Sequence, residues 1–131
     1  MKRKKILLVD DSNTILMMEK FILRNQAYEI IVASDGEEGV RKAQEHLPDL
    51  ILLDVIMPKM GGFEACRRIR ENEATRATPI IMVTTRGEAA NVETGWTSGC
   101  SDYVTKPINS IELLAKVNNF LGEGTGAEVA Q

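Results

Sequence analysis

The run Leu50-Ile51-Leu52-Leu53-Asp54 constrains the fold of this chain more than any other feature. Four consecutive aliphatic residues end in an acid, and Pro58 follows shortly afterwards. An unbroken apolar run of this length is typical of a strand buried on both faces of a parallel sheet. Asp54 would then lie at the carboxyl end of a central strand, which is where open α/β sheets bind their ligands. We therefore expect Asp54 to be the reactive group of the protein.

Strand and helix signals alternate five times along the chain. Further strands are expected at 6–9, 28–33, 80–84 and 101–105. Helices are expected at 14–24, 36–47, 63–73, 87–98 and, after a capping box at Asn109, up to Gly122. The first helix has apolar residues on more than one stripe, so it should be well buried. Alternating elements of this kind predict right-handed crossovers and a parallel sheet with helices on both faces.

Length and charge restrict the possible functions. The 131 residues suffice for one domain, which we place at 1–121, with 122–131 as a disordered tail or the start of a linker. The net charge of −3 argues against nucleic-acid binding. The first apolar run, Ile6 to Val9, is too short for a signal peptide or a membrane span. The cysteines, Cys66 and Cys100, fit a reduced cytoplasmic protein.

Reactive side chains follow four of the five predicted strands, and only the strand ending at Ala33 lacks one. Because parallel strands end at the same edge, the side chains that follow them should meet there. Clustered carboxylates repel one another unless a cation or a proton is present, and oxygen ligands at an open edge suit Mg²⁺. A hydroxyl and an ammonium group would serve a phosphoryl group, which Asp54 could accept as an acyl phosphate. The converging residues are Asp10, Asp11, Asp54, Thr84, Tyr103 and Lys106.

Together these motifs resemble the receiver domain of bacterial two-component response regulators, of the single-domain, chemotaxis-regulator-like type. The resemblance spans Lys5 to about Leu121 and is carried by Asp10-Asp11-Ser12, Leu53-Asp54-x-x-Met57-Pro58-x-Met60-x-Gly62, Val83-Thr84 and Asp102-Tyr103-x-x-Lys106-Pro107. It implies a flavodoxin-like (βα)5 fold, doubly wound, with five parallel strands in the order 2-1-3-4-5.

The resemblance also implies residue roles. Asp54 would be phosphorylated. Asp11, Asp54 and the backbone carbonyl of Ile56 would bind Mg²⁺ (or Mn²⁺), with Asp10 acting through water. Thr84, Lys106 and the backbone of Thr85 would hold the phosphoryl oxygens. Thr84 and Tyr103 would form the switch, and Lys106-Pro107 would be a cis peptide.

The implied partners are proteins. A histidine kinase or a phosphotransfer protein would supply the phosphoryl group. A downstream protein would bind the face formed by the fourth helix, fifth strand and fifth helix, which carries Val92, Trp96, Tyr103 and Lys116. Trp96 could equally be a partly buried core residue. No nucleic acid or membrane is expected as a partner, and the chain would be a monomer or a phosphorylation-dependent homodimer.

Four positions depart from the family pattern. Gly61 stands where an aspartate is usual, which should loosen its loop, and Thr85 stands where a very small residue is usual, which should narrow access to the phosphate. Ile56 and Arg86 occupy positions that tune dephosphorylation, and neither has an amide or carboxylate to orient a water. We therefore expect slow self-hydrolysis of the phosphorylated protein.

Other functions fit the sequence less well. A phosphatase or phosphotransferase of the haloacid-dehalogenase type needs a second aspartate two residues after its nucleophile, and that position is Ile56. A nucleotide- or flavin-binding domain would need a phosphate-cradling loop after the first strand. The chain could also be a receiver fragment of a longer regulator, because the tail could begin a linker.

Overall fold

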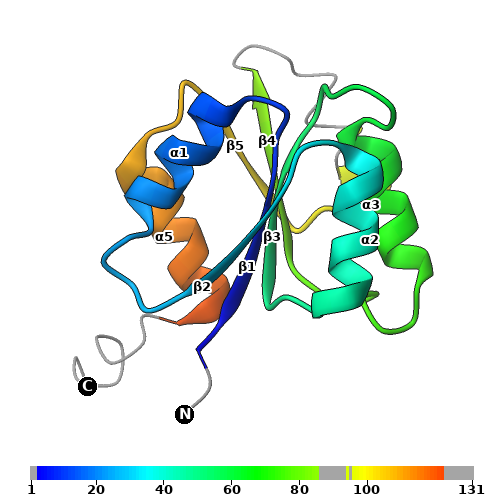
Figure 1. The fold of residues 1–131 in the computed structure, drawn as a ribbon, viewed down its shortest axis with the longest axis horizontal. Helices are drawn as coiled ribbons and strands as arrows, with labels where there is room; N and C mark the ends of the chain where they lie inside the picture. The colour runs from blue at the N-terminus through cyan, green and yellow to red at the C-terminus, as the bar shows by residue number, and fades with distance from the viewer. Residues whose placement is uncertain (1–2, 86–93, 95, 123–131) are drawn as a thin grey trace.

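The computed structural model of the chain describes residues 3–85, 94 and 96–122. The described strands form one sheet of five parallel strands in the order β2-β1-β3-β4-β5, which confirms the predicted flavodoxin-like architecture (Figure 1). In chain order the elements are β1 (Lys5–Val9), α1 (Asn13–Ile22), β2 (Glu29–Ala33), α2 (Gly36–His46), β3 (Leu50–Asp54), α3 (Gly62–Glu71), β4 (Ile80–Thr85), β5 (Asp102–Lys106) and α5 (Ser110–Leu121).

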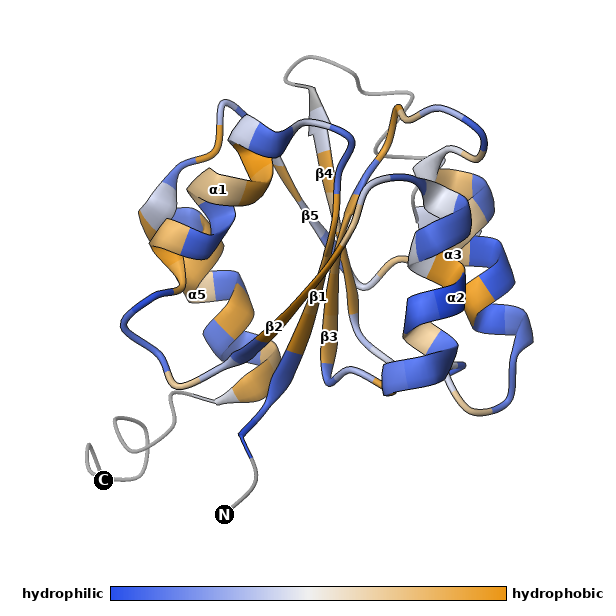
Figure 2. Cartoon of the chain, in the orientation of Figure 1, coloured by the Kyte–Doolittle hydropathy of each residue, from blue (hydrophilic) through white to orange (hydrophobic). Residues whose placement is uncertain are grey.

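The sheet is the middle of three layers. Helices α1 and α5 cover one face, and α2 and α3 cover the other (Figure 1). Alternate residues of β3 divide between the two interfaces. Leu50 and Leu52 join the cluster that packs on α1 and α5, whereas Ile51 and Leu53 join the cluster that packs on α2 and α3. The strands are accordingly the most hydrophobic part of the molecule (Figure 2), as expected for strands buried on both faces.

Local capping signals set several helix ends where the sequence predicted them. The side chains of Ser12, Asp35 and Asn109 accept hydrogen bonds from the first turns of α1, α2 and α5. Helix α2 ends at His46 because Leu47 adopts the left-handed conformation, with φ 50°. The helix predicted at 87–98 lies largely outside the described residues, and of it residues 94 and 96–98 are helical.

The prediction that α1 is well buried was wrong. Met17 is 68% exposed and Phe21 is 62% exposed, because α1 meets the sheet along one narrow stripe. On the outer side of the helix, the Arg24 guanidinium lies 3.7 Å from the centre of the Phe21 ring. That stripe contains Leu16, Glu19 and Leu23. Glu19 is therefore an acid in an apolar interface, 1% exposed, and its Oε1 has no hydrogen-bond partner in the described part of the chain.

Burial strongly raises the pKa of Glu19. Its pKa is raised from the ordinary value of 4.5 to about 8, first by burial and then by the charge of Asp10, while Lys106 opposes the shift. The folded state therefore binds more protons than the unfolded state between these two values. Between them the free energy of unfolding falls as the pH rises. Glu19 is thus a destabilising group at neutral and alkaline pH.

Replacing Glu19 with a neutral isostere should remove this dependence. We expect Glu19→Gln to be more stable than the parent protein. The gain in the free energy of unfolding should grow from about pH 5 to about pH 8 and reach ~2–4 kcal/mol. Urea unfolding across this range measures the gain. Leu16→Met, on the same stripe, is the control and should shift stability by the same amount at every pH. A constant difference for Glu19→Gln would contradict the assignment.

Candidate functional site

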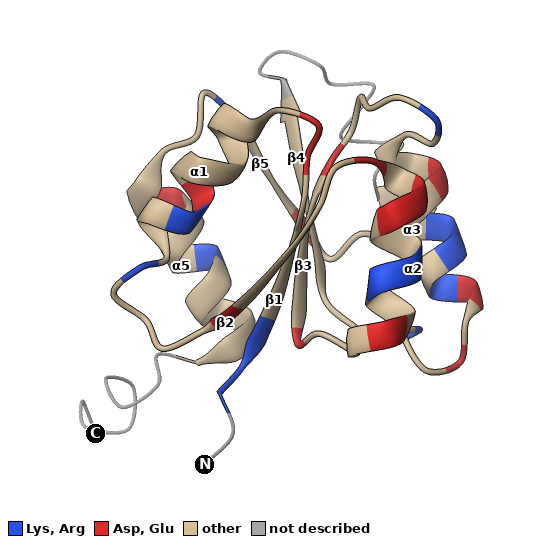
Figure 3. Cartoon of the chain, viewed as in Figure 1, with Lys and Arg blue, Asp and Glu red and all other residues tan. Residues whose placement is uncertain are grey.

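Strand register brings the predicted site residues to one edge of the sheet. Val9 of β1 lies beside Leu53 of β3, so the acids that follow them, Asp10 and Asp54, are neighbours. Lys106, at the end of β5, lies beside Thr85 of β4. Acidic residues accordingly gather where β1 and β3 end (Figure 3). The position of each group follows from the parallel sheet, as predicted.

Three carboxylates form the centre of the site. Oxygen atoms of Asp10, Asp11 and Asp54 all lie within 4.8 Å of one another. Asp10 and Asp54 are buried, at 1% and 5% exposure, whereas Asp11 is exposed. Backbone N–H groups hold the buried pair in place, since Ser12 donates to Asp10 Oδ1 at 2.9 Å and Val55 donates to Asp54 Oδ1 at 2.9 Å. The site is therefore preorganised around a concentration of negative charge.

Lys106 supplies positive charge to this cluster. Its Nζ lies 3.1 Å from Asp54 Oδ1 and 3.5 Å from Asp10 Oδ2. Burial lowers the pKa of Lys106, but the two carboxylates outweigh burial and raise it overall, so the side chain is an ammonium. The Lys106-Pro107 peptide bond is cis, as the family resemblance implied.

Asp54 loses its proton less readily than an ordinary aspartic acid does. Its pKa is raised from 3.8 to about 6, first by burial and then by the charge of Asp10. The Lys106 ammonium and the Val55 N–H group partly offset that shift. Burial and like charge thus set the carboxylate at a higher free energy than it has in water, and binding a cation would relieve this.

These groups surround a cavity of about 130 Å³ at the sheet edge. Thr84 contributes a buried hydroxyl, 3% exposed, whose Oγ1 has no hydrogen-bond partner among the described residues. The wall is made of Asp10, Asp11, Ser12, Asp54, Val55, Ile56, Thr84 and Lys106. The sequence did not single out Val55 for this site, and it named Ser12 only as part of the family motif.

The residues present fit a divalent cation. All three carboxylates are oxygen donors, and Asp10 Oδ2 is buried and, apart from its ion pair with Lys106 at 3.5 Å, has no hydrogen-bond partner in the described chain. Mg²⁺ prefers oxygen ligands and keeps several waters, which the cavity and its open side permit. One ammonium against three carboxylates leaves an excess of negative charge, which a divalent cation would neutralise.

The residues predicted for a partner-binding face are only partly described. The rings of Trp96 and Tyr103 meet edge to face, with centroids 6.1 Å apart and planes at 85°. Lys116 Nζ lies 4.9 Å from the centre of the Tyr103 ring. Trp96 is 48% exposed, so it is not a core residue. Val92 and Arg86 lie outside the described residues, and so does the side chain of Thr85.

The sequence of this chain matches the family model of the response regulator receiver domain over residues 6–118. The chain belongs to this family. The general role of this family is that of a phosphoacceptor in two-component signalling, as the motifs around Asp10, Asp54, Thr84 and Lys106 indicated.

Two curated relatives illustrate the range of lengths in the family. The receiver domain is 41% identical over 118 residues to the alkaline phosphatase synthesis transcriptional regulatory protein PhoP of Bacillus subtilis, covering 90% of this chain and 48% of PhoP. It is 35% identical over 117 residues to the protein PilH of Pseudomonas aeruginosa, covering 89% of this chain and 97% of PilH. The chain thus spans about half the length of PhoP and nearly all of PilH.

One solved structure bears on the cation. The receiver domain of the sensor histidine kinase PA1611 from Pseudomonas aeruginosa has magnesium coordinated in its active-site cleft. It aligns with this chain with a TM-score of 0.85 at 31% identity, covering 93% of this chain and 100% of that domain. Within the described residues, no helix of the present structure has the length and apolar character needed to cross a membrane.

The raised pKa of Asp54 predicts how cation binding depends on pH. Only the ionised carboxylate is a ligand, so the proton competes with Mg²⁺ below about pH 6. Millimolar Mg²⁺ should raise the melting temperature at neutral pH, and the increment should shrink as the pH falls through 6. Thermal unfolding with and without Mg²⁺ measures it. Asp54→Asn should show a small increment with little pH dependence, whereas an equal increment at acid and neutral pH in the parent protein would contradict the prediction.

Proposed function

We propose that this receiver domain is a signalling switch in which Asp54 accepts a phosphoryl group in the presence of Mg²⁺. One observation carries the proposal. Three carboxylates, the Lys106 ammonium and the buried Thr84 hydroxyl, which has no hydrogen-bond partner in the described chain, converge on one small cavity at the carboxyl edge of the sheet. No simpler structural role requires that combination, because capping acids would not need a buried hydroxyl and an ammonium at the same place.

The donors divide into two sets. Asp11, Asp54 and the backbone carbonyl of Ile56 would hold Mg²⁺ directly, with Asp10 acting through water, and Mn²⁺ can take the same oxygen ligands. The bound cation supplies neutralising charge for the phosphoryl oxygens. Thr84 Oγ1, Lys106 Nζ and the backbone N–H of Thr85 would bind the phosphoryl oxygens themselves.

In the transfer step a carboxylate oxygen of Asp54 attacks phosphorus in line with the leaving group. The new P–O bond forms as the P–N bond to a phosphohistidine of the donor breaks, and the electron pair of that bond remains on the imidazole nitrogen, which a proton then neutralises. Lys106 faces the attacked group and offsets the charge on its oxygens. A sensor histidine kinase or a phosphotransfer protein would be the donor, and the cytoplasm its place of action.

The output would be a change at the surface that carries Trp96, Tyr103 and Lys116. The phosphoryl group would draw the Thr84 hydroxyl toward it, and the Tyr103 ring would turn inward. This shifts the population toward a state with a different partner-binding face. The exposure of Trp96 and its contact with Tyr103 support this part of the proposal.

A hydrolytic enzyme with an aspartyl nucleophile is the alternative. The residue two positions after Asp54 would then have to be an acid, and it is Ile56, whose side chain is 73% exposed at the rim of the cavity. An aliphatic group there cannot protonate a leaving group or orient a water. This observation favours the switch, which keeps its phosphoryl group, over an enzyme that turns over.

Intact-mass measurement tests the phosphorylation directly. After incubation with Mg²⁺ and acetyl phosphate, we expect the protein to gain the mass of one phosphoryl group, because the cavity assembles every group needed for transfer from a small donor. Asp54→Asn is the matched control and should gain nothing, as should the parent protein without Mg²⁺. An unmodified parent protein under these conditions would defeat the proposed function.

The lifetime of the phosphoryl group tests the role of Ile56. We expect self-hydrolysis to be slow, because the exposed aliphatic side chain cannot orient an attacking water. Ile56→Gln should shorten the lifetime, whereas Ile56→Leu, with no polar atom, should leave it unchanged. Phosphate release from the isolated phosphorylated protein measures all three. A lifetime of only seconds in the parent protein, without any phosphatase, would show that the prediction is wrong.

A further inference from the structure

The end of β2 supplies no group to the phosphorylation cavity, but the turn that follows it touches the loop on which the cavity is built. Gly36, the first residue of α2, donates its backbone N–H to the carbonyl of Met60 at 3.1 Å. A Cβ atom at position 36 would overlap that carbonyl oxygen and lie 2.8 Å from its carbon. The two backbones therefore meet in a contact that only glycine permits at this position.

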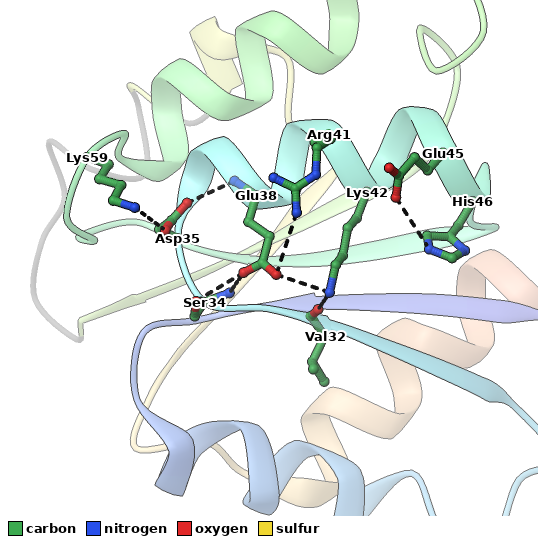
Figure 4. Close-up of polar contacts among 9 residues, drawn as sticks. All are labelled: Val32, Ser34, Asp35, Glu38, Arg41, Lys42, Glu45, His46 and Lys59. Atoms are coloured by element: carbon green, nitrogen blue, oxygen red, sulfur yellow. Dashed lines mark hydrogen bonds and ion pairs between the residues drawn. The ribbon is translucent and has the colours of Figure 1, made fainter.

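The turn itself is firmly built (Figure 4). Glu38 accepts hydrogen bonds from the Ser34 backbone N–H at 2.7 Å and hydroxyl at 3.0 Å, and it pairs with Lys42 at 3.1 Å. Asp35 caps α2 through the N–H of Glu38 at 2.8 Å. These bonds hold the pKa of Glu38 at about 2, with the Ser34 N–H as the largest cause. Residues 34–38 thus form a fixed support at the start of α2.

The loop between β3 and α3 is held from two sides. On the α2 side, Lys59 Nζ lies 3.7 Å from Asp35 Oδ2, next to the Gly36 contact. On the sheet side, Gly62 donates to the carbonyl of Val55 at 2.7 Å. Between these anchors the loop carries Ile56, which lines the cavity directly after Val55. A displacement of the loop would therefore move the backbone at the cavity wall.

We propose that Gly36 is a positioning residue for the phosphorylation site. Through Met60 it fixes the loop that places the backbone carbonyl of Ile56, so that the carbonyl stands ready as a cation ligand. The inference deepens the proposed function and depends on it. Metal ligands lose affinity when displaced by fractions of an ångström, and groups that hold them are correspondingly important.

Gly36→Ala tests the proposal, with Gly39→Ala as the control. Gly39 is buried in the same helix, and the atoms nearest to its added Cβ would be those of the Val9 side chain, at 3.0 and 3.1 Å, rather than the Met60 carbonyl. Both variants gain the helix preference of alanine. Measured by calorimetry well below the melting temperatures, the Mg²⁺ dissociation constant of Gly36→Ala should rise about tenfold or more. That of Gly39→Ala should stay close to the parent value.

The outcomes separate the two proposals. A parent protein that neither binds Mg²⁺ nor accepts a phosphoryl group defeats the proposed function. A parent protein that does both, with a folded Gly36→Ala of unchanged Mg²⁺ affinity, overturns only the positioning role. Equal losses in Gly36→Ala and Gly39→Ala would also overturn it, because the effect would then be one of general packing around α2.

A measurement on the parent protein decides the matter if Gly36→Ala does not fold. Coupling between two sites is reciprocal, so Mg²⁺ bound at the cavity must in turn stabilise the Gly36–Met60 contact. We expect saturating Mg²⁺ to slow hydrogen exchange of the Gly36 amide. The Gly39 amide, which donates to the Asp35 carbonyl at 2.9 Å inside the helix, should change much less. Exchange at Gly36 that does not respond to Mg²⁺ would overturn the proposal.

Discussion

The repulsion among the carboxylates at the ends of β1 and β3 is the constraint on which the structure depends. Two of the three, Asp10 and Asp54, are buried, and Lys106 alone among the described residues pairs with both. Such an arrangement is costly, and it persists only because the strands that carry it cannot move apart. The parallel ladders and the apolar packing on both faces of the sheet hold the charges together. The packing of the core thus stabilises a site whose like-charged carboxylates would otherwise move apart.

Much of this could be predicted because it depends on local signals. The continuous apolar run from Leu50 to Leu53 indicated a strand buried on both faces, and β3 is buried throughout. Caps at Ser12 and Asn109 need only a side-chain oxygen a few positions before an amide, so the sequence shows them directly. The site followed from topology, because parallel strands place their last residues at one edge. Residue spacing alone did not indicate the order of the strands, which came from the family resemblance.

Features that depend on the distance between elements could not be predicted. Glu19 lies on the buried stripe of α1, while the more apolar Met17 and Phe21 face outward. Composition shows which residues could face the core, but the width of the buried stripe depends on how many neighbours the helix has. The contact of Gly36 with Met60 is similar in kind, because two loops distant in sequence meet only in the folded chain. A glycine next to an aspartate is equally typical of an ordinary helix start, so the sequence carried no signal for this role.

Helix α3 connects the site to the surface that carries Trp96. At its start, the N–H of Gly62 bonds to Val55, directly after Asp54. Farther along, Cys66 Sγ donates to the Ser98 carbonyl at 3.4 Å, and Arg70 Nε donates to the Gly99 carbonyl at 2.8 Å. The turn before β5 is therefore hydrogen-bonded to α3, and the start of α3 is hydrogen-bonded to the loop that follows β3. Helix α3 thus ties the backbone directly after Asp54 to the turn that follows Trp96, two places far apart in the sequence, through hydrogen bonds at its two ends.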